Sequence, residues 1–154
     1  MVKTTLLGAA ALVAASFGTS SVANSITDCS GFGTLAFYCT ITKNGKTLSV
    51  CVNPNNVMRY RYGAPSKPAE LELFANTTTN FDGFFNYGIG RYIWHEARFD
   101  NAGYVYAVGM SVDRISEDHP ISGSVHVLKG DQTVATLACA EDTIFNAMDL
   151  LYGN

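Results

Sequence analysis

The chain has 154 residues, of which 47% are hydrophobic and 12% aromatic but only 15% charged, and its formal net charge is −3. This composition excludes an intrinsically disordered chain, because such chains are highly charged and poor in aromatic residues. It also argues against nucleic acid as a partner, since phosphate binding needs clustered Lys and Arg. The length suits one domain with a hydrophobic core rather than two.

Residues 1–23 are predicted to be a secretory signal peptide. Lys3 gives a positively charged start, an apolar run covers residues 6–15, and Ser21-Val22-Ala23 supplies the small residues that signal peptidases require before the cleaved bond. Cleavage there leaves residues 24–154 as a single β-rich domain in the periplasm or outside the cell. No later segment approaches the roughly 18 consecutive apolar residues of a membrane span, so we expect no stable membrane insertion.

The chain contains four cysteines, all after the proposed cleavage site: Cys29, Cys39, Cys51 and Cys139. An even number in an exported chain predicts two disulfides, with three possible connectivities. We favour Cys39–Cys51 and Cys29–Cys139. A hairpin loop over residues 44–46, with Gly45 in a left-handed conformation, would pair residue 43 with residue 47 and set Cys39 opposite Cys51. A two-residue Asn-Gly turn would instead place Cys51 on the other face.

Alternation of apolar and polar residues predicts a mainly β protein. Over residues 58–62 the alternation is strict: Met58, Tyr60 and Tyr62 share one face, while Arg59 and Arg61 share the other. The predicted strands cover residues 33–42, 46–53, 56–62, 69–75, 91–99, 103–112, 122–129 and 132–139. Residues 100–103 and 129–131 supply hairpin turns.

The last segment, residues 141–152, is the one predicted α-helix. Five apolar residues recur on one face of such a helix: Ile144, Phe145, Met148, Leu151 and Tyr152. Acidic residues lie in its first turn and Gly153 follows its end. We expect Phe145 and Met148 to be buried against the sheet. The predicted fold is an antiparallel sandwich or barrel with this C-terminal helix docked on it.

Five short motifs precede the last cysteine, Cys139: Phe37-Tyr38-Cys39, Asn44-Gly45-Lys46-Thr47-Leu48-Ser49-Val50-Cys51, Tyr60-Arg61-Tyr62-Gly63, Glu70-Leu71-Glu72-Leu73 and Arg98-Phe99-Asp100-Asn101-Ala102-Gly103-Tyr104-Val105-Tyr106. Together they resemble a set of short exported bacterial proteins of unknown function, over most of residues 29–139. The resemblance implies an envelope location and a disulfide-bridged hairpin, and it brings no catalytic residues. The C-terminal helix and residues 76–90 are not part of it.

The histidines give no sign of a catalytic or metal site. His95, His119 and His126 lack metal-ligand spacing, so we expect no metal and no other cofactor. Ser124 and His126 share a strand face, but roughly 6–7 Å of rise separates them, which is too far for a base to activate a nucleophile. His95 and its neighbour Glu96 point to opposite faces. The prediction is that the protein is not an enzyme.

Aromatic residues form the most distinctive cluster in the chain, which glycines interrupt: Phe81, Phe84, Phe85, Tyr87, Tyr92 and Trp94. If they are exposed, they form a recognition surface for a protein or a glycan. If they are buried, they cap one end of the core.

Arginines provide a second possible binding surface. Arg59 and Arg61 would engage the carboxylates of an acidic partner if their face is exposed to solvent, or else pair with Glu70 or Glu72 on the next strand. Glu96 and Arg98 share a face and are expected to form an ion pair. The predicted binding residues are Arg59, Arg61, Phe84, Phe85, Tyr92, Trp94, Glu96 and Arg98.

The predicted function is that of an exported, non-enzymatic binding protein with a protein partner, such as an inhibitor of, or immunity factor against, a secreted hydrolase. The alternative is a module that binds a glycan or another small envelope ligand through Trp94, Tyr92 and residues 81–87. An enzyme with a nonstandard site would need a deep cleft in which Glu96 and a histidine converge.

Overall fold

The computed structural model describes residues 26–84 and 90–152, and ten strands account for most of them. The first sheet contains β1 (Thr34–Thr40), β2 (Thr47–Val52), β3 (Val57–Gly63), β4 (Leu71–Asn76) and β10 (Phe145–Asn146). The second contains β5 (Phe81–Phe84), β6 (Tyr92–Asn101), β7 (Tyr104–Asp113), β8 (Ile121–Lys129) and β9 (Gln132–Ala138). The short helix α1 (Thr77–Asn80) connects the sheets, and two 3₁₀-helices, η1 (Glu141–Thr143) and η2 (Met148–Leu151), follow β9.

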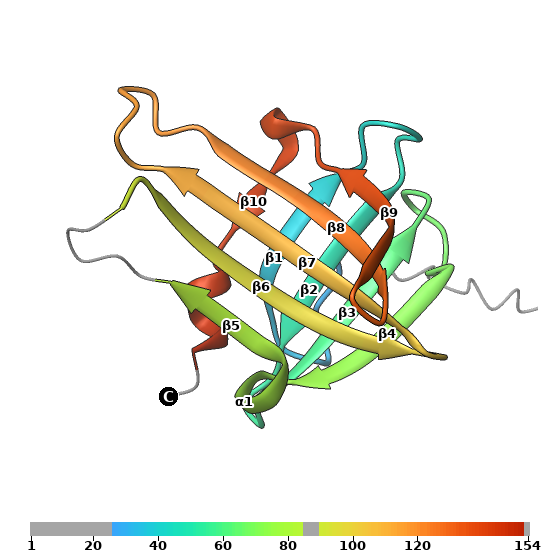
Figure 1. Ribbon diagram of the computed structural model, residues 1–154. Helices are drawn as coiled ribbons and strands as arrows, with labels where there is room; N and C mark the ends of the chain where they lie inside the picture. Colours follow the sequence, from blue (N-terminus) through green and yellow to red (C-terminus); the bar gives the residue numbers. More distant parts are fainter. Residues whose placement is uncertain (1–25, 85–89, 153–154) are drawn as a thin grey trace, which may run out of the picture.

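The two sheets pack face to face as a sandwich, with β6, β7 and β8 crossing in front of β1, β2 and β3 (Figure 1). The strand orders are β10-β1-β2-β3-β4 and β5-β6-β7-β8-β9, and every pairing is antiparallel. All eight predicted strands are confirmed, whereas β5 and β10 were not predicted. The proposed signal peptide, residues 1–23, lies outside the described residues.

The core lies between the inner faces of the two sheets. Val50 and Met58 from the first sheet, and Val108 from the second, are fully buried there. Tyr60 packs against Phe99 across the interface, with 5.5 Å between the ring centroids. Burying each such side chain contributes roughly 1.5–3 kcal/mol, which makes this layer the main source of stability. The alternation that predicted the strands therefore predicted the core face correctly.

The segment before β1 lies over the outer face of the first sheet. Ile26 is buried there, and its carbonyl accepts a hydrogen bond from Ser49 Oγ of β2. Cys29 of this segment is disulfide-bonded to Cys51 of β2. The outer face of the second sheet is different, because Trp94 and Arg98 of β6 are exposed on it.

The structure contains the disulfides Cys29–Cys51 and Cys39–Cys139, so two disulfides are confirmed but the favoured pairing is wrong. The β1–β2 hairpin closes where Ile41 N donates to Lys46 O at 2.7 Å, so its loop spans residues 42–45 and is longer than expected. This register sets Cys39 opposite Leu48.

A β-bulge between Leu35 and Phe37 then shifts the ladder again and sets Cys51 opposite Leu35. Cys51 pairs with Arg59 on the outer face, whereas Cys39 belongs to the core between the sheets. The two cysteines therefore lie on opposite faces of the hairpin and cannot form a bridge.

The predicted C-terminal α-helix over residues 141–152 is wrong. Phe145 and Asn146 form β10 and pair with Tyr38 and Phe37, so that the edge of β1 gains hydrogen-bond partners. This pairing divides the segment into η1 and η2. Met148 is buried as expected, but Phe145 is 46% exposed, because the strand turns it away from the sheet interface. No helix in residues 26–84 and 90–152 is long and apolar enough to cross a membrane.

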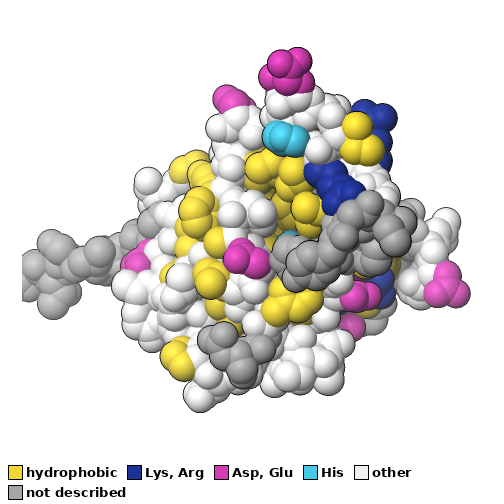
Figure 2. Space-filling view, turned by 90° about the vertical axis from the view of Figure 1, so that its left-hand side faces the viewer, with side chains coloured by type: hydrophobic (Ala, Val, Ile, Leu, Met, Phe, Trp, Pro, Cys, Tyr) yellow, Lys and Arg dark blue, Asp and Glu magenta, His cyan; other side chains and the backbone are white. Residues whose placement is uncertain are grey.

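The C-terminal segment leaves apolar residues on the surface. Figure 2 shows hydrophobic side chains gathered on the end of the molecule where, in Figure 1, β5 and the C-terminus lie. Among the exposed large apolar residues, Phe145, Leu150 and Tyr152 belong to this segment.

The two disulfides are expected to differ in their contribution to stability. Cys39–Cys139 spans 100 residues and Cys29–Cys51 spans 22. In the chain-entropy model these loops correspond to about 4.7 and about 3.4 kcal/mol. Urea unfolding should therefore show a larger loss for the double variant Cys39→Ala/Cys139→Ala than for Cys29→Ala/Cys51→Ala. Non-reducing peptide mapping provides the control, and a peptide that links Cys39 to Cys51 would contradict the observed pairing.

The β6–β7 turn offers a stabilising substitution. Ala102 and Gly103 form its two-residue loop with φ of 50° and 82°, between the paired residues Asn101 and Tyr104. Asn tolerates a left-handed conformation better than Ala, so Ala102→Asn should raise the free energy of unfolding by about 0.5–1 kcal/mol. Thermal melts compare this variant with Ala135→Asn, a substitution on the extended strand β9. A higher melting temperature in both variants would contradict the explanation by the left-handed conformation of residue 102.

Candidate functional site

A hollow of about 320 Å³ lies on the outer face of β6, β7 and β8, and we call it the Trp94 hollow. Trp94 and Glu96 of β6 line one side, while Ser122, Ser124 and His126 of β8 line the other. Alternation along β6 explains the arrangement, since Ala97 and Phe99 point to the core and their neighbours point outwards. Trp94 is 39% exposed, so its ring is available to a ligand.

The centre of the hollow's floor contains no side chain, and Ser111 of β7 lies beside it, between Trp94 and Ser122. Gly109 of β7 lies at its centre, paired with Glu96 on one side and Ser124 on the other. A Cβ built at Gly109 would have the His95 carbonyl oxygen, at 4.0 Å, as its nearest neighbour. Neither packing nor backbone conformation therefore requires glycine there, and any larger residue would fill the hollow.

Hydroxyl groups and one imidazole form the wall opposite Trp94. Ser124 Oγ lies 3.1 Å from His126 Nε2, and His126 Nδ1 lies 3.1 Å from Thr136 Oγ1 of β9. Ser111 Oγ and Ser122 Oγ are 2.8 Å apart. The expectation that Ser124 and His126 are too far apart to interact is wrong, because side chains lean along the strand and shorten the gap between their tips.

This arrangement suits ligand binding better than acyl transfer. β8 is paired with β7 and β9, so the backbone N–H groups beside Ser124 are used in the two ladders. An oxyanion intermediate needs free N–H donors aimed at it. The chain of contacts through His126 therefore orients the Ser124 hydroxyl, which remains available for hydrogen bonding to a ligand.

The charge of the hollow comes from Glu96. Arg98 Nε lies 2.6 Å from Glu96 Oε1, so the expected ion pair is confirmed. The Arg98 side chain is mostly exposed and does not line the hollow. An exposed pair of this kind adds at most about 1 kcal/mol to stability.

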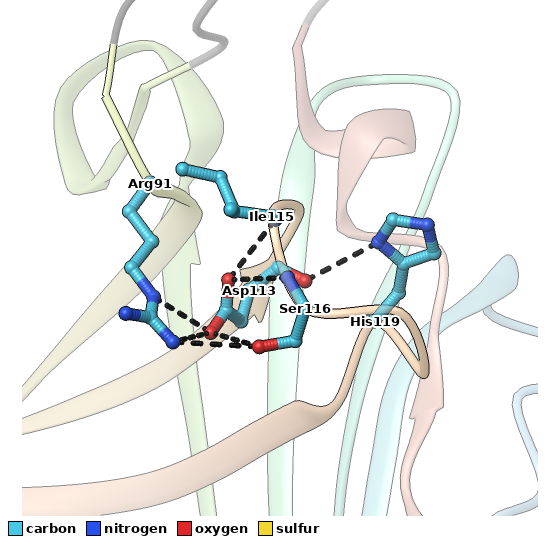
Figure 3. A network of polar contacts seen from close by, with 5 residues as sticks. All are labelled: Arg91, Asp113, Ile115, Ser116 and His119. Carbon is cyan, nitrogen blue, oxygen red and sulfur yellow. Dashed lines mark hydrogen bonds and ion pairs between the residues drawn. The ribbon is translucent and has the colours of Figure 1, made fainter.

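Asp113 fixes the strand ends beside the hollow (Figure 3). This residue ends β7 opposite Tyr92, and its Oδ2 accepts hydrogen bonds from Arg91 Nε at 2.8 Å and Ser116 Oγ at 2.8 Å. Its Oδ1 accepts from the backbone N–H groups of Ile115 and Ser116. The hydrogen bond from Arg91 is the main reason that the pKa of the Asp113 carboxyl lies well below its usual value. The network ties the start of β6 to the β7–β8 loop.

The predicted arginine surface is covered. Arg61 is 7% exposed, and its Nε lies 3.0 Å from Glu72 Oε2, the intramolecular partner named as the alternative. Arg59 Nη2 donates to the Asp28 carbonyl at 2.9 Å, and its guanidinium lies 4.4 Å from the Phe32 ring centroid. Both arginines are therefore engaged within the molecule, and Arg61 does not present its charge at the surface.

The predicted aromatic cluster is divided between core and surface. Phe81 packs against the rings of His95 and Tyr152, at centroid distances of 5.8 and 4.9 Å. Tyr92 is 49% exposed on the same face as Trp94. The backbone of Phe84 pairs with Trp94, whereas Phe85 and Tyr87 lie outside the described residues.

His95 belongs to the inner face. Its side chain is buried between Phe81 and Tyr152, and burial lowers its pKa, which favours the neutral imidazole. Glu96, its neighbour, faces the hollow on the other side of the sheet. The expectation that these two residues cannot cooperate directly agrees with the structure.

The hollow itself was not predicted. The pattern that marks it is small residues at directly paired positions of β7 and β8: Gly109 lies opposite Ser124, and Ser111 lies opposite Ser122. The pattern becomes readable only when the register of β7 and β8 is known. Sequence reasoning identified its rim, Trp94 and Glu96, but left out its floor and its polar wall.

Comparison of the chain with protein-family models, curated proteins and solved structures gives no match. The resemblance to short exported bacterial proteins therefore stays a prediction. Residues 26–84 and 90–152 contain no group of three His, Cys, Asp or Glu side chains that could hold a metal ion. The Trp94 hollow is therefore the feature of the described residues that bears on function.

Asp113→Asn should weaken the fold at neutral pH and flatten its response to acid. The pKa of Asp113 in the folded protein lies below the ordinary 3.8, so its contribution to stability is present above that value and is lost as the pH falls through the folded value. Urea unfolding at neutral pH and near pH 3 measures both effects. Asp131→Asn, in the exposed β8–β9 turn, is the control. An equal acid response in Asp113→Asn and the unmodified protein would contradict this role.

Proposed function

We propose that the protein is an exported, non-enzymatic binding protein that binds a glycan in the Trp94 hollow. Its export is supported by the features of a signal peptide in residues 1–23 and by two disulfides, which form and persist in oxidising compartments. The binding site is supported by the residues that line the Trp94 hollow.

The observation that carries the proposal is the pairing of one aromatic wall with one hydroxyl-rich wall over a floor that lacks a side chain at Gly109. Sugars present an apolar face of C–H groups and an equatorial rim of hydroxyl groups. Trp94 offers the surface for the first, and Ser122, Ser124 and His126 offer hydrogen-bonding groups for the second. The volume of about 320 Å³ suits one or two sugar rings, at the lower end of ligand pockets.

The observed geometry supports glycan binding more than inhibition of a secreted hydrolase. The inhibitor hypothesis depended on an exposed arginine pair and an exposed aromatic loop. Arg61 is buried and paired with Glu72, and Phe81 belongs to the core. Tyr92 and Trp94 remain exposed on one face of β6, and Trp94 lines the hollow.

A hydrolase is the second candidate, because Ser124, His126 and Thr136 are linked by hydrogen-bond distances. Glu96 and His126 both line the hollow, but on opposite walls with the strand of Gly109 between them. Labelling of Ser124 by a fluorophosphonate, or release of product from an acylated sugar, would favour this candidate over simple binding.

Gly109→Leu should weaken glycan binding while leaving the fold intact, because a Cβ at this position meets no close neighbour and the rest of the side chain extends into the hollow. Trp94 is the one tryptophan of the chain, so its fluorescence reports the binding directly. We expect glucose, N-acetylglucosamine or glucosamine oligomers to shift this fluorescence, and the variant to lose affinity by about tenfold or more.

Thr133→Leu, on the exposed edge strand β9, is the matched control and should bind as the unmodified protein does. A melting temperature close to that of the unmodified protein would show that Gly109→Leu is folded. Equal affinity of Gly109→Leu and Thr133→Leu would place the ligand elsewhere and contradict the proposal.

A further inference from the structure

We propose that Glu96 makes the Trp94 hollow select a sugar that carries an ammonium group, a hexosamine with a free amine, over the N-acetylated sugar and over acidic sugars. This inference rests on the proposed function and names the ligand class for that site. It follows from the charge of the lining, the position of Glu96 beside Trp94 and the way Arg98 is bound.

Among the described residues that line the hollow, Glu96 is the one acidic residue, and neither Lys nor Arg is present. The other polar groups are hydroxyls, backbone groups and the His126 imidazole, which bind neutral sugar hydroxyls without selecting for charge. An acidic sugar would therefore bring its carboxylate towards the Glu96 carboxylate, with no Lys or Arg in the lining to compensate. A ligand with an ammonium group finds its counter-ion.

Trp94 and Glu96 stand two residues apart on the same face of β6, a rise of roughly 6–7 Å. A sugar ring that stacks on the indole therefore brings one of its substituents within reach of the Glu96 carboxylate. The indole adds to the selection, since the face of an aromatic ring attracts a cation. Ser122 and Ser124 across the floor remain for the hydroxyl groups.

Arg98 does not cancel this charge. Its Nε contacts Glu96 Oε1, and its side chain is 56% exposed outside the lining of the hollow. The guanidinium therefore offsets part of the charge, but it lies outside the lining, so Glu96 is the negative end of the pair at the hollow. Oε2 has no hydrogen-bond donor among the described residues and is left to accept from a ligand. Arg98 thus fixes the orientation of the carboxylate.

The test compares glucosamine, N-acetylglucosamine and glucuronic acid oligomers of equal length, at about pH 6, by Trp94 fluorescence and calorimetry. We expect glucosamine oligomers to bind roughly threefold to tenfold more tightly than N-acetylglucosamine oligomers, with the ratio falling as salt is added. Acidic oligomers should bind most weakly. Glu96→Gln should bring the ratio close to one, because the amide keeps the shape and hydrogen bonding but loses the charge.

Glu117→Gln, an exposed acidic residue in the β7–β8 loop, is the matched control and should keep the full preference. Equal binding of the amine and N-acetyl oligomers by the unmodified protein, with both lost in Gly109→Leu, would overturn this inference and leave the proposed function standing. An unchanged ratio in Glu96→Gln, or the same loss of preference in Glu117→Gln, would also overturn it. Failure of every oligomer to bind would overturn both.

Discussion

The Cys39–Cys139 disulfide is the constraint on which the arrangement of the two sheets depends. It joins β1 to the residue directly after β9, across 100 positions of the chain. The backbone continues the link, since Thr42 N donates to Ala138 O at 3.0 Å and Ala140 N donates to Thr40 O at 2.8 Å. The second sheet is thereby held over the first at one side, while α1 connects β4 to β5 at the other. Between these two connections the inner faces bury the core and exclude water.

The N-terminal and C-terminal segments decide which outer face of the sandwich stays uncovered. The N-terminal segment crosses the outer face of the first sheet, where Cys29, Asp28 and Phe32 hold it against β2 and β3. The C-terminal segment pairs with the edge of β1 as strand β10. Neither described segment covers the hollow on the outer face of β6, β7 and β8, and the network around Asp113 holds this face at one end. The position of the hollow is a consequence of the topology as well as of its own residues.

The eight long strands could be predicted because apolar and polar residues alternate along a strand that buries one of its faces. Features that depend on an exact register could not. The β1–β2 loop spans residues 42–45 instead of 44–46, which moves the partner of Cys39 from Cys51 to Leu48 and exchanges the cysteine partners. The apolar spacing from Ile144 to Tyr152 is helical, but the need of β1 for a partner outweighed it. For the site, Trp94 and Glu96 were visible as unusual residues, whereas Gly109 and the serines carry no signal until β7 and β8 are aligned.

A site whose depth comes from a missing side chain has consequences for how such a protein can change. Gly109 contributes to neither a turn nor the core, and a Cβ there has room, so its replacement alters mainly the space above the sheet. Single substitutions there can narrow, reshape or close the site in one evolutionary step. Variants of this scaffold that differ only at this position are expected to differ in the shape of the hollow while their cores stay the same. For an engineer, the same position offers a place to attach new chemistry, because the scaffold beneath it is already held by two disulfides.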